Sequence, residues 1–316
     1  MAELALIIGN GFDLDLGLPS KYSDFIKSPE WQGVVKHVES FMHVDSYRRH
    51  SLVAQLQMAS MNSLWFDIEE EIHRFVISHP ENSSQEIGEI RDEFERIKKT
   101  LADYLKRVSK KLERKADKQK LAYKLLYFLQ ESPLSKTEIL FNYTIPDLFL
   151  ERPTYHDIGK GFFTYVHGSL RYDDIVLGCD LQKGENVNRD LSFMYKYNML
   201  NKANHVARNI LEAKEIIFFG HSMNDMDFCY FREFFKEASA SPKPIRHLTI
   251  ITYDEESERT IKDNIQNQGI SVSDLYSNLW TFDFIHTKNY YAGEKDEVDK
   301  FNGMMDRLLT KDRQGI

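Results

Sequence analysis

The segment LALIIGNGFDLDLGLPSKY, residues 4–22, gives the clearest indication of how this chain folds. Five apolar residues, enough for a short buried strand, are followed directly by the turn sequence GNGFD at 9–13. Glycines let the backbone approach a ligand closely, and a helix that begins after them presents N–H groups to an anion. The segment therefore predicts the first strand of an α/β sheet, with a ligand bound where the strand ends.

Strands and helices are predicted in alternation along the second half of the chain. Short apolar segments that end in polar or glycine-containing turns are typical of core strands in a parallel sheet. Such strands are expected at 137–144, 162–168, 214–222 and 246–253, with weaker candidates at 174–178 and 280–284. Helical patterns between them cover 200–213, 226–238 and 255–268. This alternation predicts a Rossmann-like α/β fold with a doubly wound parallel sheet.

Residues 20–132 interrupt the alternation, because they contain almost no strand-like sequence. Their clearest pattern begins with a capping box, Ser83 and Glu86, and continues with apolar residues at spacings of three and four. The apolar residues are Ile87, Ile90, Phe94, Ile97, Leu101, Tyr104, Val108 and Leu112. The spacing predicts a helix of about eight turns. Its apolar stripe is expected to pack within the insertion, and an intermolecular coiled coil is the alternative.

These patterns predict a discontinuous domain. Residues 1–20 and 135–290 are expected to form the α/β core. A helical lobe, 21–134, is inserted after its first strand, and 291–316 form a helical tail.

The composition argues against several classes of protein. With 316 residues, 42% of them hydrophobic, the chain can form a sizeable core, whereas its net charge of −8 argues against a broad nucleic-acid-binding surface. Cys179 and Cys229 are far apart and no CxxC pair occurs, which argues against a cysteine-rich zinc site and a disulfide framework. The N-terminus lacks the features of a signal peptide, and no apolar segment approaches the ~20 residues of a membrane helix. We therefore expect a cytoplasmic protein with no membrane partner.

The GNGFD turn has the composition of a phosphate-binding loop but does not match the dinucleotide fingerprint GxGxxG. The sixth position of that pattern is Leu14, and no second strand follows about 20 residues later to supply an acid for the ribose. The sequence thus argues against an ordinary NAD(P)-dependent dehydrogenase. The alternative to ligand binding is a turn whose glycines only allow a strand and a helix to pack closely.

Three other predicted strands also end in polar residues. These residues are Asn142, His167, and the group His221, Ser222, Asn224 and Asp225. The carboxyl ends of parallel strands meet at one crevice, so these side chains are expected to lie together. A neutral imidazole can accept a proton from a ribose hydroxyl or a water, and an Asn amide can orient that water or a leaving carbonyl. Taken singly, His167 is more typical of a hydrogen-bonded structural histidine than of a catalyst, and Asn142 is as consistent with capping a turn as with contacting a ligand.

The carboxylates Asp13, Asp15, Asp225 and Asp227 raise the question of a metal site. Two-metal sites need several convergent carboxylates, which the sequence does not indicate, so no metal is expected. Asp13 is expected instead to bind a ligand hydroxyl or to cap the following helix.

A second acidic motif occurs in LWFDIEEEIHRF, residues 64–75. Its i,i+4 spacing places Trp65, Glu69 and His73 on one helical face. A solvated acidic face with an aromatic anchor is the favoured interpretation. The alternative is a helix that holds the Glu69 carboxylate over the crevice.

The order of these motifs resembles the AbiH family of bacteriophage abortive-infection proteins. The family pattern is GNGFD, a helical region with WxDIE, then FNYT, HG, and FGHS followed by D and YF. The matching residues are Gly9–Asp13, Trp65–Glu69, Phe141–Thr144, His167 and Gly168, Phe219–Ser222, Asp225, and Tyr230 with Phe231. The resemblance runs from residue 4 to about 231 and implies a role in antiviral defence.

The same order is similar, more distantly, to the SIR2 (sirtuin) fold. GNGFDLDLGLP parallels the sirtuin GAGxSxxxGIP, FNYT parallels QNxD, HGS the catalytic HG, and FFGHS the GTS. By this resemblance Asn142 lies beside the nicotinamide ribose, His167 is the general base and Ser222 lies near the adenosine. An NAD pocket is then shaped by Gly9, Gly11, Gly17 and Pro19.

Departures from the sirtuin pattern limit what the resemblance implies. Ser20, Lys21 and Tyr22 stand where sirtuins have the DFR that helps to hold the nicotinamide end, and the sirtuin zinc module is missing. A protein deacylase is therefore not expected. What remains resembles the SIR2-like NAD-cleaving domains of bacterial antiviral systems.

This resemblance implies an NAD glycohydrolase in phage defence, with NAD as its substrate and Asn142 and His167 as catalytic residues. The alternatives are a nucleotide-binding sensor that turns nothing over, and a metal-dependent nuclease. The long helix, 84 to about 114, is the expected surface for self-association or for a defence-system partner. The residues expected to bind the nucleotide are Gly9, Asn10, Gly11, Phe12, Asp13, Gly17, Pro19, Gly220, His221, Ser222 and Asp225.

Overall fold

The chain forms two compact units, each assembled from separate parts of the sequence. The sheet unit contains Met1–Leu18, Leu112–Val166 and Asn201–Ile316, and the helical unit contains Pro19–Lys111 and His167–Leu200. The computed structural model describes residues 2–41, 51–62, 66–79, 83–150, 163–181, 185, 188–196, 203–242 and 246–310. In this part of the chain no helix is long and apolar enough to cross a membrane.

The described part of the sheet unit contains six parallel strands in the order β3-β2-β1-β4-β5-β6. This is the strand order of the Rossmann fold, and it confirms the predicted class. The central strand is β1, Leu4–Ile8, whose five residues are all buried. The other strands are β2 Lys136–Leu140, β3 Phe163–Tyr165, β4 Glu215–Phe219, β5 His247–Thr252 and β6 Thr281–His286.

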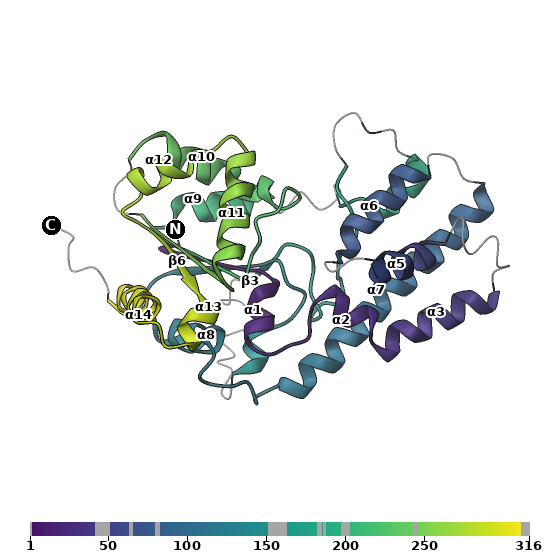
Figure 1. Cartoon of the computed structure of the whole chain (residues 1–316), viewed down its shortest axis with the longest axis horizontal. Helices are drawn as coiled ribbons and strands as arrows, with labels where there is room; N and C mark the ends of the chain where they lie inside the picture. Colours follow the sequence, from purple (N-terminus) through teal and green to yellow (C-terminus); the bar gives the residue numbers. More distant parts are fainter. Residues whose placement is uncertain are drawn as a thin grey trace. The chain divides into compact units, whose positions relative to one another are not determined.

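Helices cover both faces of this sheet (Figure 1). On one face, apolar side chains of four helices join strand residues such as Ile7, Phe218 and Ile250 in one buried core. These helices are α9 Ala203–Glu212, α10 Arg232–Ala240, α11 Glu255–Asn267 and α12 Val272–Asn278. The other face carries α1 Asn10–Asp15, α8 Leu121–Glu131, α13 Thr287–Tyr291 and α14 Lys295–Leu309.

Some predicted elements differ from the structure. The prediction of a strand at 174–178 is wrong, because Val176 donates its N–H to the His167 carbonyl at 2.8 Å and the segment folds back on the preceding turn. The weaker candidate at 280–284 is confirmed as β6. The segment predicted as one helix at 226–238 begins with a short 3-10 turn, Phe228–Tyr230, before α10.

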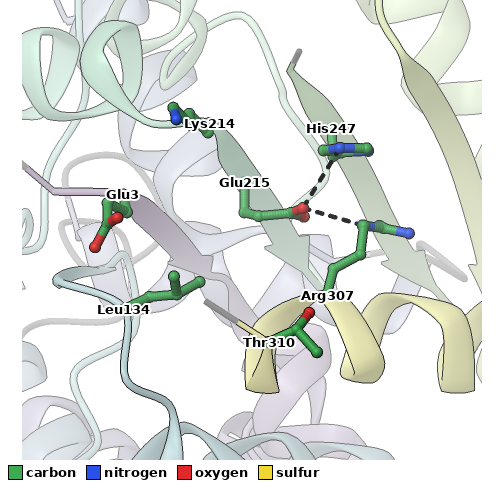
Figure 2. Close-up of a pocket in the computed structure, with 7 residues that line it drawn as sticks. All are labelled: Glu3, Leu134, Lys214, Glu215, His247, Arg307 and Thr310. Atoms are coloured by element: carbon green, nitrogen blue, oxygen red, sulfur yellow. Dashed lines mark hydrogen bonds and ion pairs between the residues drawn. The ribbon is translucent and has the colours of Figure 1, made fainter. Parts of the chain in front are cut away.

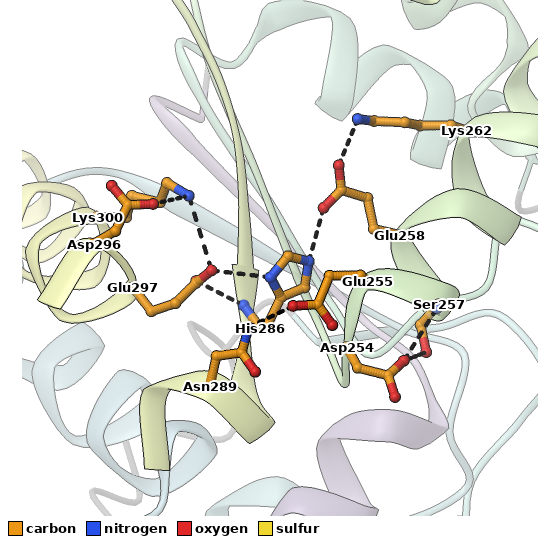
Figure 3. Close-up of polar contacts among 10 residues, drawn as sticks. All are labelled: Asp254, Glu255, Ser257, Glu258, Lys262, His286, Asn289, Asp296, Glu297 and Lys300. Atoms are coloured by element: carbon orange, nitrogen blue, oxygen red, sulfur yellow. Dashed lines mark hydrogen bonds and ion pairs between the residues drawn. The ribbon is translucent and has the colours of Figure 1, made fainter. Parts of the chain in front are cut away.

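A histidine between two carboxylates joins β6 to the helices on either side of it (Figure 3). Nδ1 of His286 lies 2.9 Å from Glu297 of α14, and Nε2 lies 2.7 Å from Glu258 of α11. Glu297 also accepts the His286 backbone N–H at 2.8 Å. The two ring nitrogens of His286 thus link β6 to a helix on each side of it.

The helical unit is dominated by α7, Ser84–Leu112. The predicted capping box is confirmed: the Ser83 N–H donates to the Glu86 carboxylate at 2.7 Å, and the Glu86 N–H donates to the Ser83 hydroxyl at 3.3 Å. The apolar stripe of α7 is buried from Ile90 to Val108 and half-buried at its two ends, as the packing interpretation requires. The other helices described in this unit are α2 Tyr22–Ile26, α3 Pro29–Phe41, α5 Leu52–Asn62 and α6 Ile68–Ser78.

Candidate functional site

Glycines bring the turn after β1 against the turn after β4. A Cβ at Gly9 would lie 2.6 Å from the carbonyl oxygen of Gly220, and a Cβ at Gly11 would lie 2.6 Å from the Cα of Gly220. Gly220 itself has a φ of +65°, and a Cβ there would lie 2.4 Å from the backbone of Gly11. All three positions therefore require glycine for close packing at the point where the strand order reverses.

The backbone N–H groups of the GNGFD turn, which could have bound a phosphate, form hydrogen bonds within the protein. Gly9 donates to the Phe219 carbonyl and Gly11 to the Gly220 carbonyl, both at 2.9 Å, while Phe12 donates to the Gly9 carbonyl at 3.0 Å. The N–H groups of Gly9, Gly11 and Phe12 are thus already used within the fold. Packing explains the glycines, and their contribution to nucleotide binding stays a prediction.

A polar cluster lies where β1 and β2 end. Asp13 is in α1, directly after β1, and Thr144 follows β2. The Thr144 hydroxyl oxygen lies 2.9 Å from Oδ1 and 2.8 Å from Oδ2 of Asp13. Asn142, two residues before Thr144, neighbours the same carboxyl group. We call Asp13, Asn142 and Thr144 the strand-end cluster.

Burial governs the charge of the Asp13 carboxyl. The side chain is 1% exposed, and loss of hydration raises its pKa to about 7, against smaller lowering effects of Thr144 and Asn142. Among the described residues Asp13 forms no ion pair. Asp13 lies inside α1 and does not cap it, so that part of the prediction is wrong. A carboxyl group of this kind can exchange a proton near neutral pH.

Asn142 is the unusual member of the cluster. Its side chain is 6% exposed, yet its amide forms no hydrogen bond of good geometry to the described residues, although it interacts with the Asp13 carboxyl and lowers the pKa of that group. An unsatisfied buried polar group costs about 1–3 kcal/mol, and such groups in a native protein call for a specific explanation. A ligand that pairs with the amide is the explanation most consistent with its place at the carboxyl edge of the sheet.

The residues after β4 have other partners. His221 accepts the Met223 N–H on Nδ1 at 2.9 Å, and its ring packs edge-on against Phe141 at 4.4 Å. The Ser222 carbonyl accepts from Asn264, and Asp225 accepts from Gln268 at 2.8 Å. These contacts assign His221 to the core and join the turn to α11.

The carboxylates considered for a metal site are also engaged elsewhere. Asp15 accepts the Ala122 N–H at 2.9 Å and the Tyr291 hydroxyl at 2.7 Å, which fixes the start of α8. Among the described residues no three His, Cys, Asp or Glu side chains form a group that could hold a metal ion.

Two of the predicted site residues, His167 and Pro19, belong to the helical unit. His167 is 8% exposed, and its neighbour Gly168 has a φ of +74°, with a Cβ position only 1.9 Å from the Asp174 carbonyl oxygen. Pro19 accepts the Tyr104 hydroxyl on its carbonyl at 2.6 Å. The strand-end cluster lies entirely in the sheet unit, so the predicted catalytic pair is divided between the two units.

The acidic motif of the helical unit is not a solvated face. The side chain of Glu69 is 14% exposed, and its carboxylate lies 2.6 Å from Nζ of Lys196, which is 5% exposed. Burial raises the Glu69 pKa, whereas Lys196 and His167 lower it. His73 pairs instead with Glu185 at 2.9 Å. Trp65 lies outside the described residues.

No sequence pattern marks Thr144 or Lys196 as part of a site. Thr144 was present in the FNYT motif but had no distinguishing pattern of its own, and only the β1–β2 pairing brings it to Asp13. Lys196 belongs to none of the sequence motifs, and only the fold brings it close to Glu69.

A small cavity lies at the opposite, amino-terminal edge of the sheet (Figure 2). Glu215 and Arg307 form its polar core, with Nε of Arg307 3.0 Å from the Glu215 carboxylate, and His247 lies 3.8 Å from the same oxygen. The remaining lining residues are Glu3, Leu134, Lys214 and Thr310. This cavity is separate from the strand-end cluster.

Comparison with known proteins identifies the family. The family model described as "Bacteriophage abortive infection AbiH" matches residues 5–246. No curated protein and no solved structure matches the chain significantly. The match includes GNGFD, FNYT and FGHS, and it covers more than half of the sequence. The chain therefore belongs to the AbiH family of bacteriophage abortive-infection proteins.

Proposed function

We propose that this protein is an NAD glycohydrolase that acts in phage defence, in the cytoplasm, by releasing nicotinamide from NAD. The observation that carries the proposal is the buried amide of Asn142, which faces the Asp13 carboxyl and forms no hydrogen bond of good geometry to the described residues. The family supplies the role in abortive infection. The strand order supplies a fold that binds nucleotides at the edge where Asn142 lies.

The chemistry of the strand-end cluster suits the nicotinamide end of NAD. The Asn142 amide has both a donor and an acceptor for the carboxamide, a ribose hydroxyl or the attacking water. Glycosidic cleavage passes through a ribose with oxocarbenium character, so oriented dipoles stabilise the developing charge. Binding requires movement of the residues that cover the cluster, because Asn142 is only 6% exposed.

His167 enters the proposal through the sirtuin resemblance. Its expected role is to polarise a ribose hydroxyl or to activate the water. Because it belongs to the helical unit, its contribution is tested by a variant of its own.

The test is to incubate purified protein with NAD and to follow nicotinamide by chromatography. Wild type should release nicotinamide, and Asn142→Ala and His167→Ala should each lose about 10²-fold or more of the rate. The matched control is Asn278→Ala, because the Asn278 amide is satisfied by the Ala238 and Ser239 carbonyls, away from the cluster. Circular dichroism of each variant verifies that it folds.

A nucleotide-binding sensor is the second candidate, because an unsatisfied amide favours a ligand whether or not that ligand is cleaved. Thermal shift with ADP-ribose separates the two functions. Stabilisation by ADP-ribose without nicotinamide release would favour the sensor. Wild-type rates from Asn142→Ala would contradict the assignment of the site.

A further inference from the structure

We infer that Asp13 is the general base of this reaction, and that its carboxylate takes the proton of the water that attacks C1′ of the ribose. The inference rests on the proposed NAD hydrolysis and adds a catalytic residue to it. The sirtuin resemblance gives Asp13 no such role, and the sequence assigned it only to ligand binding or helix capping.

The position of Asp13 supports this role. It lies in α1 immediately beyond the central strand, and it shares the strand-end cluster with the unsatisfied amide of Asn142. An amide that holds a water or a nicotinamide carbonyl there would place it beside the Asp13 carboxyl group. General bases act on such protons at hydrogen-bond distance.

The hydrogen bonds of Asp13 leave it able to exchange a proton. The Thr144 hydroxyl has one proton but lies within 2.9 Å of both carboxyl oxygens. It can fully satisfy only one of them, so the other oxygen retains a lone pair or carries the proton itself. The groups that face the carboxyl are the neutral side chains of Thr144 and Asn142, and both lower its pKa, though by less than burial raises it.

The reaction balances with the groups named. The C1′–N bond of the cationic nicotinamide ring breaks, and the electron pair of that bond leaves with nicotinamide, which becomes neutral. The water oxygen forms the new bond to C1′, and its proton passes to the Asp13 carboxylate. The products are ADP-ribose, nicotinamide and a protonated Asp13, which then returns its proton to solvent.

The raised pKa of Asp13 agrees with its role as a general base. Burial raises its pKa to about 7, so the carboxylate and the acid are both populated near neutral pH. A base is most effective when its pKa lies close to the working pH.

The experiment measures nicotinamide release against pH for wild type, Asp13→Asn and Asp13→Glu. The wild-type rate should rise with pH and level off above about pH 7. Asp13→Asn should lose about 10²–10⁴-fold of kcat while its thermal shift with ADP-ribose is retained. Asp13→Glu should restore part of the rate. Asp263→Asn is the matched control, because Asp263 is an exposed carboxylate of α11 in the same unit.

The possible outcomes separate the inference from the proposed function. If wild type is active, Asn142→Ala is inactive and Asp13→Asn keeps the wild-type rate and pH profile, the base assignment is overturned and the glycohydrolase stands. If the rise with pH disappears in His167→Ala but persists in Asp13→Asn, His167 is the base. No nicotinamide release by wild type would overturn both.

Discussion

Asn142 combines deep burial with an amide that forms no hydrogen bond of good geometry to the described residues. A group retained for a ligand is expected to lower stability when that ligand is absent. Removing the amide is therefore expected to leave stability unchanged or to raise it, and to abolish function.

This expectation can be measured with Asn142→Leu, which replaces the amide with an apolar side chain of similar size. Its free energy of unfolding in urea should equal that of wild type or exceed it by about 1 kcal/mol, while NAD turnover is lost. Asn278→Leu is the control, because its amide donates to two carbonyls, and its removal should cost about 1 kcal/mol. Strong destabilisation by Asn142→Leu would show that the amide is a structural group.

The turns after β1 and β4 pack backbone against backbone in the sheet unit. Gly220→Ala should destabilise the protein by at least about 2 kcal/mol, since it combines a positive φ with a Cβ that collides with Gly11. Thermal and urea unfolding would measure the loss. Gly303→Ala provides the comparison, because its Cβ meets open space in α14 and should stabilise by about 0.5–1 kcal/mol. Equal effects of the two substitutions would contradict the packing role of Gly220.

A carboxyl group of α7 holds the start of α5. Glu93 is 4% exposed and accepts the Ser51 hydroxyl and the Val53 N–H, both at 2.9 Å. Burial raises its pKa from 4.5 to about 7, so the folded protein binds a proton there more tightly than the unfolded chain does. The resulting stabilisation is complete below pH 4.5 and is lost as the pH rises through about 7.

Glu93→Gln should therefore make stability less dependent on pH. The thermal midpoint of wild type is expected to fall between pH 4.5 and about 7, and the fall should be smaller in this variant. Glu95→Gln is the control, since Glu95 is an exposed partner of Lys98 on the same helix. An identical pH profile for wild type and Glu93→Gln would refute the assignment.

Across the whole molecule, the sequence was sufficient to predict those elements that a local pattern specifies. The five apolar residues of β1 and the capping box at Ser83 each contain their own evidence, and both are confirmed. The apolar segment 174–178 resembled a strand, but its backbone bonds to the turn at His167 and not to a strand, which no local pattern indicates.

The candidate site depended more on the fold. The GNGFD and FNYT motifs identified Asp13 and Asn142, but the Asp13–Thr144 contact needs the pairing of β1 with β2. The glycines of GNGFD predicted a close approach correctly, yet the partner in that approach is the backbone of Gly220. A glycine pattern does not distinguish a bound phosphate from a second turn, because either can approach closely only where the residue has no Cβ.

The central position of β1 affects the order in which a newly synthesised chain can acquire its structure. β1 is made first, but its neighbours β2 and β4 begin only at Lys136 and Glu215. Until those residues leave the ribosome, an entirely apolar strand has no partner, and contacts so distant in sequence form slowly. Asp13 meets Thr144 only after β2 is made, and the GNGFD turn is braced only after Gly220 is made. Whatever activity this cluster has in the braced turn, it can therefore arise only after Gly220 has been synthesised.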